Sequence, residues 1–250
     1  MRGCPLALVP TTLLGMVDAC LGGKTGFDLF GTKNLAGTFY PARHVYMPLE
    51  SLSSLPPPEW KSGMGELIKT AVLDGDDFLD MLSGMACAFP LDSDLLCQCI
   101  SRAVRLKGGI VAEDPFETGN TRMLLNLGHT FGHALEAAAG LGKISHGEAV
   151  AWGIARSCDL GLALGICPSG RAEQIKTLLD SFGFEIAAPH PLSDNTGDFI
   201  RALRSDKKKR GGKINFIVPD EISARPVAVD LTEPHSMKII DRVIKGALSS

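Results

Sequence analysis

The chain has 250 residues, enough to bury a sizeable core in one large domain or one and a half. Its formal net charge of −3 and apolar content of 45% are ordinary for a soluble protein and exclude the basic field that nucleic-acid binding requires. The seven cysteines, odd in number and scattered, are typical of reduced thiols. No apolar run reaches the roughly 18 residues of a membrane span. We expect a cytoplasmic protein that binds small molecules or copies of itself, and neither nucleic acid nor membrane.

The first fifty-odd residues have the pattern of a parallel α/β layer. The apolar run Leu6–Val9 predicts a buried strand that ends at Pro10. A helix capped by Thr11 or Thr12 is expected to follow and to end before Gly22, and His44–Met47 predicts a second strand. Strand, helix and strand in this order indicate a parallel sheet, although two strands cannot form one alone.

Three consecutive prolines, Pro56 to Pro58, give the strongest boundary signal, and the pattern after them is mainly helical. Two β-prone segments near the end, Lys213–Val218 and Pro226–Val229, are expected to pair as a hairpin. The fold class is therefore an α/β remnant of a parallel sheet followed by a mainly α-helical domain. The predicted helices are Met64–Leu73, Phe78–Met85, Leu95–Val111, Met123–Ala139, Glu148–Gly165, Arg171–Phe182, Asp198–Leu203 and Met237–Leu248.

Three of the six histidines fall within one short stretch. His129 and His133 stand four residues apart, so on a helix they project from one face. His146 can return to that face after a turn at residues 140–142. Neutral imidazoles in an apolar helix are costly unless something binds their free nitrogens. The cluster indicates metal binding or proton transfer, and spacing alone does not choose between them.

Glu66 lies between apolar residues near the expected start of a helix. Taken alone, it fits an exposed first-turn carboxylate that faces the helix dipole. Together with the histidines it becomes a candidate third ligand of a zinc site with two histidines and one carboxylate.

Two glycine-rich segments fail as nucleotide motifs. Leu21–Thr25 lacks the first glycine of a phosphate loop, and Gly63–Ile68 lacks the third glycine of a dinucleotide fingerprint. What remains is a set of cations that a polyanionic substrate could bring together, although charge runs are most often solvated. These cations are Lys24, Lys33, Lys69, Lys107, Arg122 and the run Lys207–Arg210.

Several of these segments together resemble the 3-dehydroquinate synthase family of sugar-phosphate cyclases. The resemblance runs in order from Arg2 to Lys208, and the histidine block is its most specific part. It rests on Val9–Leu14, Val17–Asp18, Gly22–Gly26, Lys33–Leu35, Gly65–Lys69, Leu125–Glu136 and His146–Val150.

The resemblance implies a phosphate-eliminating carbon–oxygen lyase of the shikimate pathway, which makes the precursor of the aromatic amino acids. Such an enzyme converts a phosphorylated keto acid, 3-deoxy-D-arabino-heptulosonate 7-phosphate, to 3-dehydroquinate, and it uses NAD and Zn²⁺ or Co²⁺. Residues 1–55 would be the C-terminal part of a Rossmann-like NAD-binding domain, and residues 56–250 a helical metal- and substrate-binding domain. The resemblance also implies a homodimer.

Site residues follow by matching positions. The implied metal ligands are Glu66, His129 and His146. The implied catalytic residues are His133 as a free proton carrier, Glu117 as a second acid/base, and Lys107. The substrate would contact Asp18, Lys24, Asn34, Lys69, Arg122, Asn126 and Lys207, and Arg2 would reach into the site of a neighbouring subunit. In the part of the NAD site that this chain contributes, NAD would contact Thr11, Thr12, Lys33, Ser51 and Ser54.

The sequence also departs from the family pattern. Most of the Rossmann-like half that precedes residue 1 in a typical member is absent, so we expect weak NAD binding. One additional residue between Gly119 and Arg122 shifts Arg122 relative to Glu117. The alternatives are a related cyclase acting on another heptulose phosphate, an inactive remnant serving as a helical zinc-binding module, and a metal-dependent polyol dehydrogenase. Arg122, Asn126 and Lys207 suit a carboxylated substrate and argue against the first alternative.

Overall fold

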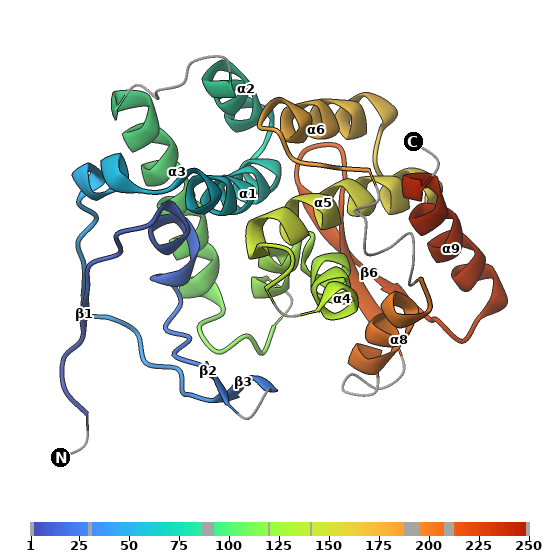
Figure 1. Ribbon diagram of the computed structural model, residues 1–250, viewed down its shortest axis with the longest axis horizontal. Coiled ribbons are helices and arrows are strands. Elements are labelled where there is room, and N and C mark those ends of the chain that lie inside the picture. The colour runs from blue at the N-terminus through green and yellow to red at the C-terminus, as the bar shows by residue number, and fades with distance from the viewer. Residues whose placement is uncertain are drawn as a thin grey trace.

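A computed structural model describes residues 3–29, 32–86, 93–119, 121–140, 142–187, 196–207 and 213–248. A small N-terminal layer packs beside a larger, mainly helical part, as the sequence predicts (Figure 1). The strands of the layer are β1 (Ala7–Leu8), β2 (Phe27–Leu29), β3 (Thr32–Ala36) and β4 (His44–Val45), with a π-helical turn at Gly15–Ala19 and a 3₁₀ helix at Leu49–Ser54.

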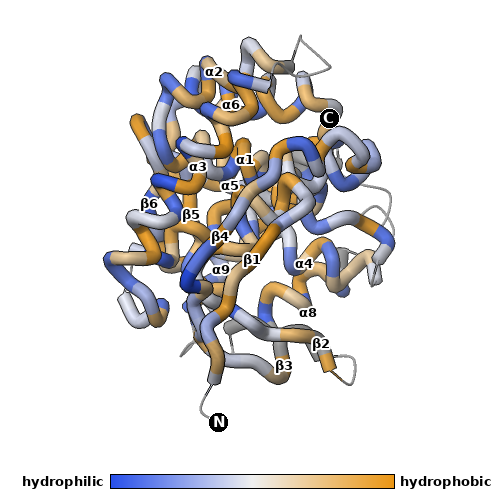
Figure 2. The backbone as a smooth tube through the Cα atoms, turned by 90° about the vertical axis from the view of Figure 1, so that its left-hand side faces the viewer, coloured by the Kyte–Doolittle hydropathy of each residue, from blue (hydrophilic) through white to orange (hydrophobic). Residues whose placement is uncertain are grey.

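The two predicted strands of the layer form its parallel pair. β1 pairs with β4 so that Ala7 lies opposite His44 and Leu8 opposite Val45. Figure 2 shows the hydrophobic residues of β1 in orange beside β4. The predicted helix after β1 is shorter than expected, because only residues 13–19 are helical. The antiparallel hairpin β2–β3 was not predicted.

In the helical part, several helix ends lie a few residues from the predicted ones, and two differences are larger. α1 begins at Pro57 instead of Met64. The helix expected over 123–139 is divided at Gly128, whose φ of 78° lies in the left-handed region. The predicted hairpin is present as antiparallel strands β5 (Ile214–Pro219) and β6 (Ala224–Val229). The helices are α1 (Pro57–Asp74), α2 (Asp76–Ala86), α3 (Ser93–Glu113), a 3₁₀ helix (Arg122–Asn126), α4 (His129–Ala139), α5 (His146–Ala163), α6 (Ser169–Ser181), α8 (Thr196–Lys207) and α9 (Pro234–Leu248).

α5 lies at the centre of the helical part and contacts α1, α4, α6, α9 and β5. Glycines let its neighbours approach closely. A Cβ on Gly147 would lie 2.2 Å from the Ser62 carbonyl oxygen of α1, and a Cβ on Gly153 would lie 1.9 Å from that of Gly128. These contacts hold the start of α5 against α1 and the residue before α4 against the middle of α5. Among the described residues, no helix is long and apolar enough to span a bilayer.

Candidate metal and substrate site

Three candidate ligands from three helices meet where α1, α4 and α5 cross. The Oε1 atom of Glu66 lies 3.1 Å from the Nε2 atom of His146 and 3.4 Å from the Nε2 atom of His129. Ligand atoms bound tetrahedrally at about 2.0–2.1 Å from a zinc ion are separated by roughly 3.3 Å. Both histidine nitrogens therefore stand near the spacing from Glu66 that a zinc ion requires, and the three ligand atoms all lie within 4.8 Å of one another.

Glu66 is fully buried and does not occupy the exposed first turn that it fits when taken alone. Since α1 begins earlier than predicted, Glu66 falls in the middle of the helix. Burial by itself raises the pKa of Glu66, but Lys69, His129 and His146 together hold it well below its usual value. The carboxylate is thus ionised at neutral pH, as a metal ligand must be.

His129 presents a free nitrogen to Glu66. Burial, the largest influence, lowers the pKa of His129 to about 4, so its ring is neutral at pH 7. Its Nδ1 atom lies 3.2 Å from the Leu127 carbonyl oxygen, which assigns the proton to Nδ1. The lone pair of Nε2 then faces a carboxylate oxygen, and two acceptors face one another. A cation bound between the His129 nitrogen and the Glu66 oxygen would remove the repulsion between these two acceptors. The residues present therefore fit a metal ion.

His146 has a carboxylate on each side. Its Nδ1 atom lies 3.5 Å from Oε1 of Glu136, and its Nε2 atom faces Glu66. The hydrogen bond to Glu136, followed by that to Glu66, raises the pKa of His146 to about 9. A carboxylate that holds Nδ1–H leaves Nε2 directed at a metal, a common arrangement around zinc.

His133 lies beside the trio and is exposed. Its ring centroid is 5.3 Å from that of His129 and 6.3 Å from that of His146. His133, Glu136 and His146 also form a set whose ligand atoms lie within 4.8 Å of one another. Geometry therefore permits two metal-ligand sets that share His146, and the set with Glu66 is the more buried.

A buried charge network joins the trio to the N-terminal layer. Lys69, with 2% of its surface exposed, forms ion pairs with Glu66 and with Asp18, whose Oδ1 atom is 3.3 Å away. Lys107 of α3 donates to the Asp18 carboxylate at 2.5 Å and to its carbonyl oxygen at 2.7 Å. Burial tends to lower the pKa of Lys69, but Glu66 and Asp18 outweigh it and raise that pKa. Three residues predicted for substrate binding and catalysis thus join the metal-ligand set in one network.

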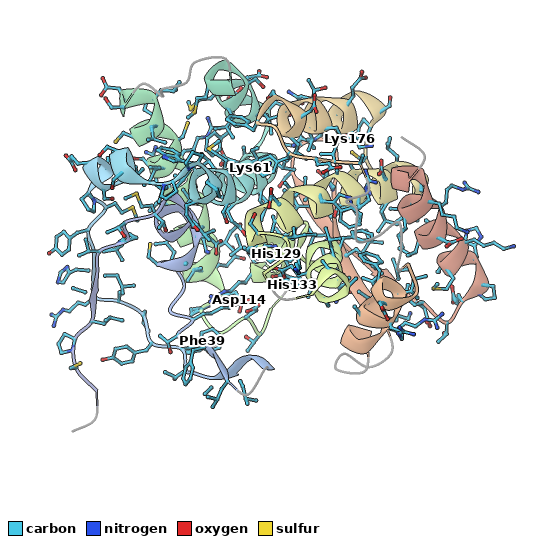
Figure 3. All side chains as sticks on the ribbon, viewed as in Figure 1. Phe39, Lys61, Asp114, His129, His133 and Lys176 are labelled. Carbon is cyan, nitrogen blue, oxygen red and sulfur yellow. The ribbon has the colours of Figure 1, made fainter. Side chains whose placement is uncertain are left out.

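A cleft of about 730 Å³ opens beside the histidines. Figure 3 shows His129 and His133 on neighbouring turns of α4, on the same side of the molecule as Asp114 and Phe39. Four of the lining residues, Phe39, Phe116, Thr130 and Asn215, carried no signal in the sequence that pointed to a site. The cleft is lined by Lys24, Phe39, Phe116, Glu117, Gly119, Met123, Asn126, His129, Thr130, His133 and Asn215.

The loop that carries Glu117 is fixed by Asp114. The Asp114 carboxylate accepts hydrogen bonds from the backbone amides of Thr118 at 2.9 Å and Gly119 at 3.0 Å. Glu117 adopts a φ of 57°, unusual for a residue with a side chain, and pairs with Lys24 at 2.5 Å. The loop thus directs a carboxylate and a lysine into the cleft together.

Arg122 makes different contacts from those expected of a substrate ligand. It is 3% exposed, and its guanidinium donates to the carbonyl oxygens of Pro115 at 2.6 Å and Gly22 at 3.0 Å. The same group stacks over the Phe39 ring at 5.6 Å. Arg122 therefore ties the N-terminal layer to the loop, outside the residues that line the cleft.

Four of the residues implied for NAD, namely Thr11, Thr12, Ser51 and Ser54, follow the carboxyl ends of β1 and β4, where open α/β sheets bind ligands, whereas Lys33 lies in β3. The Ser51 hydroxyl lies 3.4 Å from the Thr11 carbonyl oxygen, and Ser54 donates to Ser51 at 3.3 Å. Thr12 accepts a hydrogen bond from the Gly15 amide at 3.0 Å. The remaining predicted residues fall outside the described part of the chain, either entirely, as for Arg2, or in their side chains, as for Lys33, Asn34 and Lys207.

Comparison with known proteins identifies relatives along the whole chain. Residues 1–62 match the N-terminal region of 3-dehydroquinate synthase, and residues 63–209 match its C-terminal region. The 3-dehydroquinate synthase of Colwellia psychrerythraea is 38% identical over 96% of this chain and 67% of that protein. That of Dictyoglomus turgidum is 38% identical over 96% of this chain and 66% of that protein. The chain thus spans about two thirds of the length of these relatives.

Solved structures of sugar-phosphate cyclases have the same fold. A 2-epi-5-epi-valiolone synthase from Streptomyces hygroscopicus with NAD⁺ and Zn²⁺ bound matches 98% of this chain and 67% of its own, with a TM-score of 0.85 and 25% identity. A 2-deoxy-scyllo-inosose synthase complexed with carbaglucose-6-phosphate, NAD⁺ and Co²⁺ matches the same shares of the two chains, with a TM-score of 0.80 and 26% identity. The matched regions, the identities and the shared fold together show that this chain belongs to the 3-dehydroquinate synthase family.

Proposed function

We propose that this chain carries the metal- and substrate-binding machinery of a 3-dehydroquinate synthase. The reaction would convert 3-deoxy-D-arabino-heptulosonate 7-phosphate to 3-dehydroquinate and phosphate. The observation that most supports this proposal is the trio of Glu66, which is buried, with His129 and His146, which are partly buried. The trio is linked through Lys69 to Asp18 and bordered by a polar cleft.

The residues of the trio would hold a zinc or cobalt ion. When bound, such an ion supplies Lewis acidity toward substrate hydroxyls, and NAD supplies a hydride acceptor. The chain itself contributes charge and orientation. Asp18, held by two buried lysines, stays ionised and can accept a hydrogen bond from a substrate hydroxyl. Lys24 at the cleft would neutralise the phosphate or the carboxylate of the substrate.

Two further residues would move protons. His133 lines the cleft, and its exposed ring can exchange a proton between a substrate oxygen and solvent. Glu117 lines the same cleft, forms an ion pair with Lys24 and can act as a second base. Thr11 and Ser51 would form this chain's side of the NAD site.

A second candidate is a cyclase that acts on a sugar phosphate without a carboxylate. It is favoured by the TM-score of 0.85 to a valiolone synthase. The 38% identity to 3-dehydroquinate synthases, against 25% to that structure, favours the first candidate. Asn126, predicted to contact a carboxylated substrate, lines the cleft.

The test is a calorimetric titration of the zinc-loaded protein with the carboxylated heptulosonate phosphate and with a heptulose 7-phosphate that lacks the carboxylate. We expect the carboxylated compound to bind at least about tenfold more tightly, the effect of one charge-assisted hydrogen bond. The reverse order would favour the second candidate. Assays of phosphate release with added NAD test turnover, and binding without turnover would limit the proposal to a binding role.

The ligand assignment is tested separately by metal analysis. We expect zinc to be lost in His129→Ala and His146→Ala and to be retained in His133→Ala. Because His133, Glu136 and His146 form the competing set, loss of zinc from His133→Ala together with retention in His129→Ala would move the ion to that set.

A further inference from the structure

A second concave region lies on the α5–α6–α9 side of the molecule. It is a cleft of about 460 Å³, lined by Arg156, Asp159, Leu162, Ala163, Lys176, Arg242 and Val243. None of these residues lines the cleft beside the histidines. Figure 3 shows Lys176 on α6, apart from His129 and His133. The metal and substrate site therefore does not account for this region.

Arg156 is the unusual residue of this cleft. Only 4% of its surface is exposed, and its guanidinium lies 5.4 Å from the Trp152 ring. Its Nη2 atom donates to Asp159 at 3.0 Å. Among the described residues, its Nε and Nη1 atoms have no acceptor. Buried charged donors without acceptors are costly, so the site lacks a negatively charged partner.

Another buried arginine provides a comparison. Arg171 is 6% exposed, and each of its Nη atoms has an acceptor, namely the Asp76 carboxylate for Nη1 and the carbonyl oxygens of Val72 and Ile222 for Nη2. Within the part of the chain that the structure describes, its Nε atom has no acceptor, as in Arg156, so the two arginines differ at Nη1. Arg156 differs because its buried Nη1 atom has no acceptor among the described residues, and its side chain lines a cleft.

The charges around the cleft are also unbalanced. Of the residues that the structure describes, Asp159 is the one acidic residue that lines the cleft, and it is shared between Arg156 and Lys176. Arg242, which is exposed on α9, adds a third cation at the edge. Three cations around one carboxylate leave a net positive site, half closed by α5, α6 and α9, that favours an anion.

We propose that this cleft is a binding site for a small oxyanion, the phosphate or carboxylate group of a metabolite. Arg156 donates to the anion from Nε and Nη1, and Lys176 and Arg242 approach it from the edge. The site is separate from the proposed metal and substrate site, and its existence does not depend on the function proposed for that site.

Trp152 provides a local reporter, because it lies beneath the Arg156 guanidinium and Trp60 is the only other tryptophan of the chain. In a Trp60→Phe background, fluorescence is titrated with inorganic phosphate and separately with succinate, at constant ionic strength. We expect a saturable change with at least one of them, and which anion gives it identifies the preferred group. In Arg156→Met the apparent affinity should fall at least about tenfold.

Two further variants keep the test decisive. Arg242→Gln changes an exposed residue, so it reports on the site even if Arg156→Met fails to fold, and we expect it to weaken binding. Lys24→Met weakens anion binding in the histidine cleft and should leave the Trp152 response intact. The proposal is overturned if neither anion gives a saturable response, if Arg242→Gln binds as tightly as its parent, or if Lys24→Met abolishes the response.

Discussion

Replacing Glu66 by glutamine tests whether the buried charges hold one another in place. Glu66, Lys69, Asp18 and Lys107 carry formal charges that cancel, and Glu66 and Lys69 are almost fully buried. Breaking a buried ion pair typically costs about 3–5 kcal/mol because the remaining charge is left uncompensated. Lys69 keeps Asp18 at 3.3 Å, so we expect the lower end, about 3 kcal/mol, in the metal-free protein.

The assay is urea denaturation in the presence of a chelator, for the wild type, Glu66→Gln, Lys69→Met and the double variant. The double variant should be less destabilised than the sum of the single variants, since removing both charges leaves neither uncompensated. The pKa of Glu66 is depressed by Lys69 and the histidines despite burial. Its contribution is therefore present above the unfolded-state pKa and is lost as the pH falls through the folded value, so the difference should shrink in acid.

A free energy of unfolding for Glu66→Gln within about 0.5 kcal/mol of the wild type at pH 7, the range of ordinary surface substitutions, would contradict this prediction. The prediction also fails if the effects of the two single variants simply add. Either result would mean that water or local rearrangement screens the network more strongly than its burial indicates.

Three other predictions concern the same region. The pKa of His146 is raised to about 9, chiefly by Glu136, so zinc must displace a proton from this ring at neutral pH. Chelator competition should show zinc affinity rising about tenfold per pH unit from pH 7 to 9. An affinity that does not change with pH would contradict this. In the metal-free protein, the stability that this shift provides is complete below pH 6.5 and is lost as the pH rises through about 9. Gly147→Ala should destabilise the fold by roughly 1–3 kcal/mol in urea denaturation, because its Cβ would lie 2.2 Å from the Ser62 carbonyl oxygen. Gly108→Ala, which has open space around the added Cβ, is the control and should stabilise the fold by about 0.5–1 kcal/mol. Asp114→Asn should weaken substrate binding in calorimetry without changing zinc affinity, since Asp114 holds the loop of Glu117 and does not contact the trio; equal losses of both would show a general defect.

Much of the candidate site could be predicted because its chemistry is concentrated in a few unusual residues. The histidine cluster stands out in an apolar helix, and the structure brings His129, His133 and His146 together. Spacing along one helix could not choose the ligands, because Glu66, whose Oε1 atom lies 3.4 Å from His129 Nε2, comes from α1, and His146 comes from α5. That choice depends on how three helices cross, which is a tertiary property.

The position of Glu66 could not be predicted from local pattern. The three prolines predict a boundary, and the helix that follows begins within them. Pro57 and Pro58 form the first turn of α1, where a missing amide proton costs nothing. The helix therefore starts earlier, and Glu66 becomes an interior residue. Gly128 was likewise absorbed into one helical pattern, because a single glycine gives only a weak signal of a break.

The unpredicted hairpin β2–β3 shows a different limit. Phe27 and Leu35 are apolar yet 56% and 54% exposed, so hydrophobicity at these two positions does not mark a buried face. Phe39 and Phe116 reach the cleft through contacts between segments far apart in the chain, with ring centroids 6.1 Å apart. Contacts of this kind carry no local pattern.

The glycine contacts around α5 have a consequence for how the trio meets its ion. Where helices touch through backbone atoms, at Gly147 against Ser62 and at Gly153 against Gly128, the distance between them is set by the main chain and not by adjustable side chains. The ligands are therefore preorganised before any metal arrives. Binding then requires little loss of conformational entropy, and an ion whose preferred bond lengths differ from this fixed spacing must strain the helices to enter.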